Sequence, residues 1–176
     1  RSNLACGHTR AALYTAHALV SVAAALCVLL ASLVPGMLLS WYLFRAFMLT
    51  PAELALVLLD CVLLTLAYAA ISIALAMNLS HKSTSSVVGL LVMIALAIAA
   101  SKVESMMTDI TIHGVAASPL TTAIVSVLYD FLPSAQCIQI SNQMFDHMAR
   151  WPLYSLLLTI SAAFFGYLLF RKKDLK

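Results

Sequence analysis

The sequence predicts an all-α, polytopic helical membrane protein with four transmembrane helices and a short extracytoplasmic amphipathic helical hairpin. Hydrophobic residues make up 63% of the 176 residues and charged residues only 10%, whereas an ordinary soluble domain has about 25% charged residues. The apolar residues also lie in long uninterrupted runs, which is typical of helices whose solvent is lipid. The net charge of +3 is small and scattered, so we expect the lipid bilayer, and no nucleic acid, as a partner.

The first two spans are predicted over residues 11–34 and 51–78. Each exceeds the roughly 20 helical residues that cross a hydrocarbon core of about 30 Å. The first is expected to end before Pro35, because proline lacks the amide hydrogen of a helix interior. The second has a strong start signal, since Thr50 can cap, a proline follows it, and Glu53 can close a capping box.

The other two spans are predicted over residues 85–101 and 152–170. Small residues in the third span, including Gly89 and Ala100, suggest close packing against other helices. The last span is followed at once by three cationic residues at 171–173, a strong cytoplasmic anchor in a tail over 171–176.

The segment 102–150 is more polar and is predicted to form two short amphipathic helices at the membrane surface. Apolar residues recur at helical spacing in both halves, and Pro133 separates them with Ser134 available as a helix cap. The members of the two apolar faces are Leu120, Ile124, Leu128 and Phe131 in the first half, and Ile138, Phe145 and Met148 in the second.

The distribution of positive charge predicts a multi-pass protein of the cell membrane with both termini of this chain in the cytoplasm. That orientation places seven lysines and arginines inside and leaves only Arg45, Lys102 and Arg150 outside, in keeping with the positive-inside rule. We therefore expect the segment 102–150 to be extracytoplasmic.

Asp60 is the most informative single residue, because it is the only acid well inside a predicted span. A carboxylate near the middle of a bilayer costs about 2.5–3.5 kcal/mol on insertion scales, so it should face protein or water. It either lines the transport path or holds a cationic substrate group, or it ties helices together as a protonated or hydrogen-bonded acid, or the long helix lifts it into the headgroups. His17 is expected to make an interhelical hydrogen bond, and Thr65 and Tyr68 fall where they can face a cavity.

Three patches resemble one family. Residues 3–14 (NLACGHTRAALY), with Gly7, His8, Thr9, Arg10 and Tyr14 as the matched positions, resemble the stretch before the third span of type 2 ABC-exporter permeases, including bacterial peptide-antibiotic efflux and immunity permeases. Residues 128–141 are similar to the outer helical hairpin of that family, and residues 166–176 to its C-terminus.

The resemblance implies a permease subunit that forms the translocation path while a separate ABC ATP-binding subunit hydrolyses ATP. It also implies a second permease subunit, identical or different, and a six-span fold of which the first two spans are missing here. Residues 1–10 would then form the cytoplasmic coupling segment that docks on the ATPase, with Arg10 and His8 as polar contacts.

Other function classes are less well supported. An intramembrane enzyme needs paired carboxylates, a metal-ligand cluster or a Ser/His pair within the spans, and the spans hold one acid and one histidine far apart. We therefore predict that the chain is not an enzyme and holds no catalytic, metal or cofactor site. A membrane immunity or regulatory protein that acts without an ATPase stays open as the alternative.

Overall fold

The computed structural model describes residues 10–44, 49–79, 82–111, 118–142, 144 and 148–172. These residues form six α-helices and no strand. Four of the described helices, namely α2 (Arg10–Phe44), α3 (Pro51–Asn78), α4 (Lys82–Thr111) and α7 (Trp151–Lys172), are long and apolar enough to cross a membrane. The predicted fold class, a polytopic helical protein, is thereby confirmed.

The start of α3 lies where its capping signals placed it. The Thr50 side chain accepts a hydrogen bond from the Glu53 amide, and Glu53 Oε2 accepts one from the Thr50 amide at 2.8 Å, while Pro51 occupies the first helical position. The helix then runs without interruption to Asn78, the predicted end. At the α-helical rise its 28 residues span about 42 Å, so it must tilt or protrude from a bilayer.

The predicted end of the first helix, before Pro35, is wrong. The helix α2 continues through Pro35 to Phe44 and is 35 residues long. Proline removes one backbone hydrogen bond, but residues around it are strongly apolar and a helix remains the most favourable backbone in lipid. Trp41 and Tyr42 therefore belong to the last turns of α2 and not to a loop.

The helix α4 is also longer than predicted, and its small residues are mostly not buried. It runs through the weakly polar stretch to Thr111, because serine, threonine and lysine do not break a helix. Ala100 is fully buried against Tyr129 and Ala135, but an added Cβ at Gly89 would meet nothing within 4 Å. The small residues of α4 are thus closely packed only near the hairpin, at Ala100.

The hairpin consists of α5 (Pro119–Phe131) and α6 (Pro133–Ser141), which meet at 84°. The residue that caps α6 is Leu132, without a side-chain hydrogen bond, so the predicted capping role of Ser134 is wrong. The second helix ends at Ser141, short of the predicted face over 138–148; Phe145 is outside the described residues, and Met148 is buried in a turn.

The first predicted apolar face of the hairpin points outward. Leu120 is 71% exposed and Ile124 50% exposed, whereas the buried side of α5 is formed by Val125, Tyr129 and Asp130. An apolar face exposed on this chain is what a helix in contact with lipid or a partner presents.

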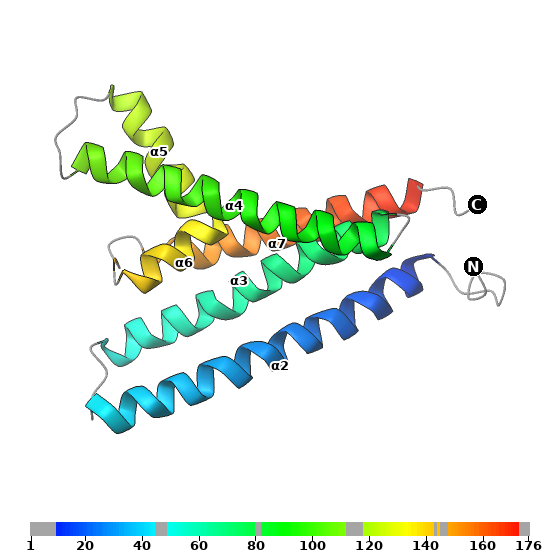
Figure 1. The fold of residues 1–176 in the computed structure, drawn as a ribbon, viewed down its shortest axis with the longest axis horizontal. Coiled ribbons are helices and arrows are strands. Elements are labelled where there is room, and N and C mark those ends of the chain that lie inside the picture. Colours follow the sequence, from blue (N-terminus) through cyan, green and yellow to red (C-terminus); the bar gives the residue numbers. More distant parts are fainter. Residues whose placement is uncertain are drawn as a thin grey trace.

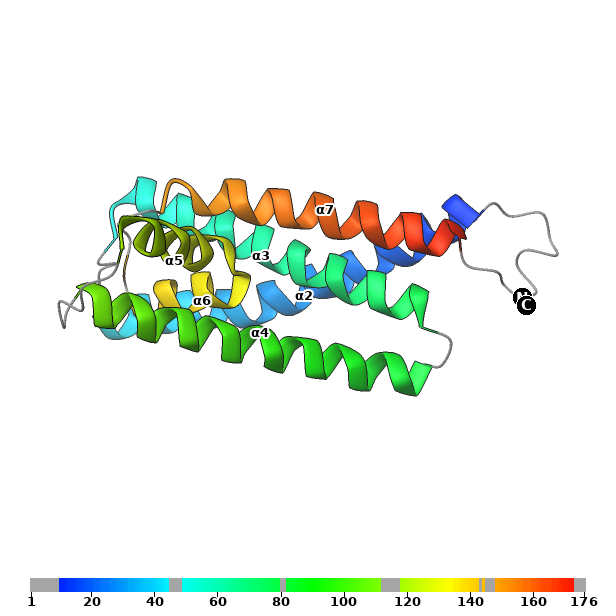
Figure 2. The ribbon, with the colours of Figure 1, turned by 90° about the horizontal axis from the view of Figure 1, so that it is seen from above.

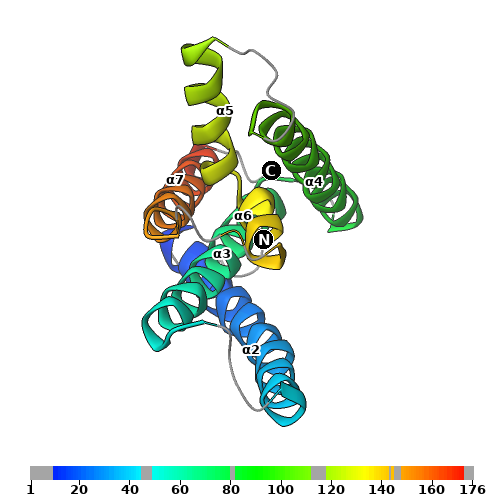
Figure 3. The same ribbon diagram turned by 90° about the vertical axis from the view of Figure 1, so that its left-hand side faces the viewer.

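Helix α3 is the centre of the molecule. It packs against α2, α4, α6 and α7, and its contact with α7 is the most extensive among the described helices. Figure 1 shows α3 between α2 and α4, with the start of α2 and the end of α7 at one end of the bundle and the hairpin at the other. The view from above shows α7 and α4 on opposite sides of α3 (Figure 2), and the end-on view shows α2, α4 and α5 spreading outward (Figure 3).

Candidate functional site

An open groove runs between α2 and α3. Its cavity volume is about 560 Å³. From His17 to Ser32 it follows α2 for 15 residues, which is about 22 Å at the helical rise. This length is most of the roughly 30 Å thickness of a hydrocarbon core. Its polar lining consists of His17, Ser21 and Ser32 from α2 and Thr65, Tyr68 and Ser72 from α3.

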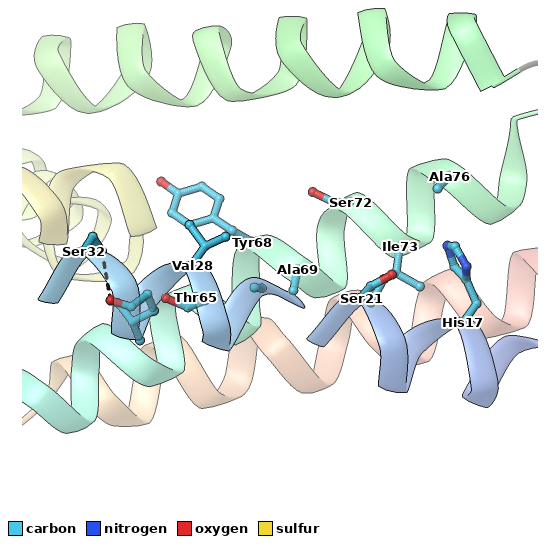
Figure 4. Close-up of a pocket in the computed structure, with 12 residues that line it drawn as sticks. His17, Ser21, Val28, Ser32, Thr65, Tyr68, Ala69, Ser72, Ile73 and Ala76 are labelled. Carbon is cyan, nitrogen blue, oxygen red and sulfur yellow. Dashed lines mark hydrogen bonds between the residues drawn. The ribbon is translucent and has the colours of Figure 1, made fainter. Parts of the chain in front are cut away.

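The polar side chains of the groove come from one stripe on each helix. On α2 they recur four and eleven residues apart, and on α3 three and four residues apart, so helical periodicity puts each set on one face. Figure 4 shows His17, Tyr68 and Ser72 pointing to the side of the bundle on which α4 runs. The remaining lining is alanine, valine, leucine and isoleucine.

Some of these polar groups have partners and others have none among the described residues. The hydroxyls of Ser32 and Thr65 donate to backbone carbonyls of their own helices, at 2.9 and 2.8 Å. The Tyr68 hydroxyl lies 2.7 Å from Ser134 Oγ and joins α3 to α6. Ser21 and His17 take part in no side-chain hydrogen bond within the described part of the chain.

This pattern limits what can cover the groove. An amide or hydroxyl that loses its hydrogen bonds in an apolar medium costs about 1–3 kcal/mol by protein mutational data. Lipid tails offer no hydrogen bonds to Ser21, Ser72 or His17. Water, a polar or amphipathic molecule, or another polar helix face would satisfy them, so the groove is the part of this surface least suited to lipid.

Thr65 and Tyr68 line the groove, as their positions in the sequence allowed. The expected interhelical hydrogen bond of His17 is not found among the described residues, and the side chain is exposed in the groove instead. At this level α2 packs on α3 through Tyr14, Ala18 and Val22, and His17 lies beside this contact in the lining of the groove.

Asp60 lies outside the groove, in a buried polar cluster between three helices. Its side chain is fully buried, as are those of Gln136 in α6 and, at 1% exposure, Ser155 in α7. The Ser155 hydroxyl oxygen lies 3.0 Å from Asp60 Oδ1 and 2.8 Å from Gln136 Oε1. Of the alternatives for Asp60, the structure shows the contact between helices.

Gln136 and Gln139 extend this cluster to α5. The Gln136 side-chain amide donates to the Asp130 carbonyl, and the Gln139 amide donates to the Tyr129 carbonyl at 2.8 Å. Carbonyls in the last turn of a helix have no partner within the helix. Two glutamines of α6 therefore cap the end of α5 and fix the angle between the two helices.

Tyr14, the last matched position of the predicted coupling segment, is buried where α2 meets α7. It is 7% exposed, and its hydroxyl donates to the Ala163 carbonyl at 3.3 Å. Its ring packs against Tyr167 and Phe170, with ring centroids 5.6 and 5.9 Å away. Tyr14 is thus a structural anchor of the first turns of α2.

Gly166 lets α7 approach α3 closely at the same level. A Cβ at this glycine would lie 2.6 Å from the Ala74 Cβ and 2.9 Å from the Tyr14 hydroxyl. The Asn78 side-chain amide donates to the Gly166 carbonyl at 3.0 Å and to the Ala74 carbonyl at 2.8 Å. Such contacts between small residues, supported by side-chain amides, are typical of helix pairs in membranes.

The remaining predicted site residues are placed only in part. Gly7, His8 and Thr9 lie outside the described residues, and Arg10 is the first residue of α2. Tyr14 follows Arg10 by four positions, so about one helical turn connects the end of the predicted coupling segment to the junction with α7.

Sequence reasoning missed Ser155, Gln136, Ser21 and Ser72. A single serine or glutamine carries no signal by itself, because its role depends on which helix lies opposite. For Ser21 and Ser72 the sequence did contain a signal. Ser21 lies four residues after His17, and Ser72 continues the helical spacing of Thr65 and Tyr68, so each extends a polar stripe on its helix.

Comparison of the chain with protein-family models, with curated proteins and with solved structures finds no match.

Proposed function

We propose that this chain is the membrane-spanning permease subunit of an ABC exporter and that the groove between α2 and α3 forms part of its translocation path. The observation that carries the proposal is the groove, with six polar side chains along about 22 Å of otherwise apolar helices. The resemblance of residues 3–14, 128–141 and 166–176 to type 2 exporter permeases supports the same function from an independent direction.

In this proposal the groove is completed by other helices. Its side chains His17, Tyr68 and Ser72 point to the side where α4 runs, and the outward faces of α2 and α4 are apolar and exposed. A second permease subunit would cover the groove and leave the outer faces to lipid. Ligand sites between helices of bundles are common in helical proteins.

The proposal also assigns a mechanical role to the start of α2. An ATP-binding subunit docked on residues 1–10 would move Arg10, and Tyr14 would pass this movement to α7, because its ring and hydroxyl contact that helix directly. A rigid helix that continues from a docking segment into a span can act as a lever. Since α2 also forms one wall of the groove, the same movement would change the width of the groove.

The test is co-expression with a candidate ABC ATP-binding subunit encoded next to the gene, followed by purification in detergent and an ATPase assay. We expect the two proteins to copurify and the permease to raise the ATPase rate. Replacing residues 7–10 by alanines should abolish the stimulation, whereas Lys102→Ala, which removes one positive charge at the other end of the bundle, should not. An ATPase rate that is the same with and without the permease would contradict the proposal and favour a regulatory membrane protein.

A further inference from the structure

The hydrogen bonds of the Asp60 cluster determine where its protons are. Ser155 Oγ lies within hydrogen-bond distance of two oxygens, Asp60 Oδ1 at 3.0 Å and Gln136 Oε1 at 2.8 Å. A serine hydroxyl has one hydrogen and can donate only once, and an ionised carboxylate and an amide oxygen are both acceptors only. With Asp60 ionised, one of these two contacts would join two oxygens without a hydrogen.

An ionised Asp60 would be compatible with both contacts if the Gln136 amide donated a hydrogen to Ser155, but the orientation of this amide excludes that arrangement. If the amide were turned over, its nitrogen could donate to Ser155, but its oxygen would then face the Asp130 carbonyl, to which the nitrogen now donates. Exchanging a hydrogen bond for a contact between two buried oxygens is unfavourable. The oxygen of Gln136 therefore faces Ser155, and the missing hydrogen must come from Asp60.

The surroundings of Asp60 favour the same proton. No part of its side chain is exposed to solvent, and Oδ2 has no hydrogen-bond partner among the described residues. The titratable groups that face it are uncharged thiols, Cys61 of α3 and Cys137 of α6. No lysine, arginine or histidine of the described residues pairs with it, and a buried charge without a partner is strongly disfavoured.

We propose that Asp60 is a proton-binding site that fastens the α5–α6 hairpin to α3 and α7. With the proton on Asp60, the carboxyl group donates to Ser155, Ser155 donates to Gln136, and Gln136 donates to the Asp130 carbonyl. Every donor in this chain then has one acceptor, and the chain runs from α3 through α7 and α6 to α5.

Loss of the proton would release the hairpin from α7. The Ser155 hydrogen would turn to the carboxylate, Gln136 Oε1 would lose its donor, and the new charge would draw in water or a cation. The link between α6 and α7 would then be broken, while the Tyr68–Ser134 contact would still hold α6 to α3. Binding of one proton is thereby coupled to the position of the hairpin at one end of the bundle (Figure 1).

The first test is infrared spectroscopy of the purified protein in nanodiscs. Wild-type protein at neutral pH should show the carbonyl stretch of a buried, protonated carboxylic acid, and Asp60→Asn should remove this band. Titration to alkaline pH should convert the wild-type band to that of a carboxylate. If Asp60→Asn removed no carboxylic-acid band, Asp60 would be ionised and the proposal would be wrong.

The second test uses Cys61, which is partly buried and packs in one cluster with Ile140 of α6. In a variant whose other three cysteines are alanines, so that no new hydroxyl faces Asp60 from position 137, the rate of Cys61 modification by a water-soluble maleimide reports release of the hairpin. Asp60→Asn is the matched control, because its amide nitrogen can donate to Ser155 at every pH. An ionised Asp60 disfavours the neighbouring Cys61 thiolate, so its charge alone would slow modification at alkaline pH and cannot imitate release of the hairpin.

The quantity to compare is the modification rate of the protein that keeps Asp60, divided by the rate of the Asp60→Asn variant. This ratio should be close to one at acidic pH and should rise about fivefold or more at alkaline pH, the factor that one buried hydrogen bond contributes. Ser155→Ala in the protein that keeps Asp60 should be modified fast at every pH. A ratio that is independent of pH would overturn the proposal, and so would a ratio that depends on sodium concentration but not on pH, because the ligand would then be a cation.

Discussion

At the scale of single residues, the structure separates side chains that hold helices together from side chains that face open space. Gly166 and Tyr14 belong to the first group, since one allows α7 to touch α3 and the other fills the space beside it. Ser21 and Ser72 belong to the second group, since each lines the groove without a hydrogen bond among the described residues. The two groups predict different consequences of mutation.

Gly166→Ala should destabilise the protein. The new methyl group would lie 2.6 Å from the Ala74 Cβ, so α3 and α7 must move apart, and overpacking of this kind costs about 1–3 kcal/mol. We expect the midpoint of thermal unfolding in detergent to fall by several degrees.

Gly89→Ala is the matched control for this substitution. Both glycines lie inside helices, but an added Cβ at Gly89 meets nothing within 4 Å. Replacing an unhindered helical glycine by alanine gains up to about 1 kcal/mol from helix propensity. Equal destabilisation by both substitutions would contradict the close contact at Gly166.

Tyr14→Ala should uncouple the two subunits of the proposed exporter without separating them. The substitution removes the ring contacts with Tyr167 and Phe170 and leaves residues 1–10 unchanged. We expect the ATP-binding subunit to copurify as before and the stimulation of its ATPase to be largely lost. Tyr14→Phe keeps the ring and loses only a long hydrogen bond of 3.3 Å, so it should keep most of the stimulation; equal loss in both variants would point to the hydroxyl and not to packing.

At the scale of the elements, the hairpin depends on side chains of α6 that cap α5. Gln136 and Gln139 each donate to a carbonyl near the end of α5, and both side chains are buried. An unsatisfied buried carbonyl costs about 1–3 kcal/mol. The hairpin angle of 84° is therefore fixed by two amide groups and by Pro133, which cannot continue α5.

Gln139→Leu should loosen the end of α5. The leucine keeps the bulk of the side chain but leaves the Tyr129 carbonyl without its donor. Hydrogen–deuterium exchange of the backbone amides over residues 129–136 should become faster, by roughly fivefold to a hundredfold for the energy of one such bond. Ser141→Ala on the same helix removes only a hydrogen bond to its own helix, at an exposed site, and its exchange rates should equal those of the wild type.

The helix bounds show which signals in the sequence are strong. Thr50, Pro51 and Glu53 fix the start of α3 because three local effects agree at one place. The prediction at Pro35 was wrong, since the rule that proline ends a helix is derived from water and is weaker where no solvent can satisfy a broken backbone. The two helices of the hairpin were predictable, but the direction of its apolar face was not. In a soluble protein an apolar helix face turns toward the protein core, whereas in a membrane protein it can turn toward lipid.

At the scale of the whole molecule, the described chain has a well-packed half and an open half. The pair α3 and α7 forms the packed half, while α2 and α4 expose apolar side chains along most of their length. The sequence predicted the four helices that are long and apolar enough to cross a membrane, because each has enough apolar length. It could not predict the groove or the Asp60 cluster, because these depend on pairs such as Asp60 and Ser155, 95 residues apart, whose proximity is set by tertiary packing.

The most direct test of the central claim, that the groove is a polar path through an otherwise lipid-facing protein, is the reactivity of cysteines placed along it. In a background with the four native cysteines replaced, Ser21→Cys and Leu19→Cys lie at nearly the same depth on α2, about 3 Å apart along its axis, but only Ser21 lines the groove while Leu19 is 72% exposed outside it. In membranes, Ser21→Cys and Ser72→Cys should react with a small membrane-impermeant thiol reagent, and Leu19→Cys should not. Protection of all three positions, or equal reactivity of all three, would contradict the assignment of the groove.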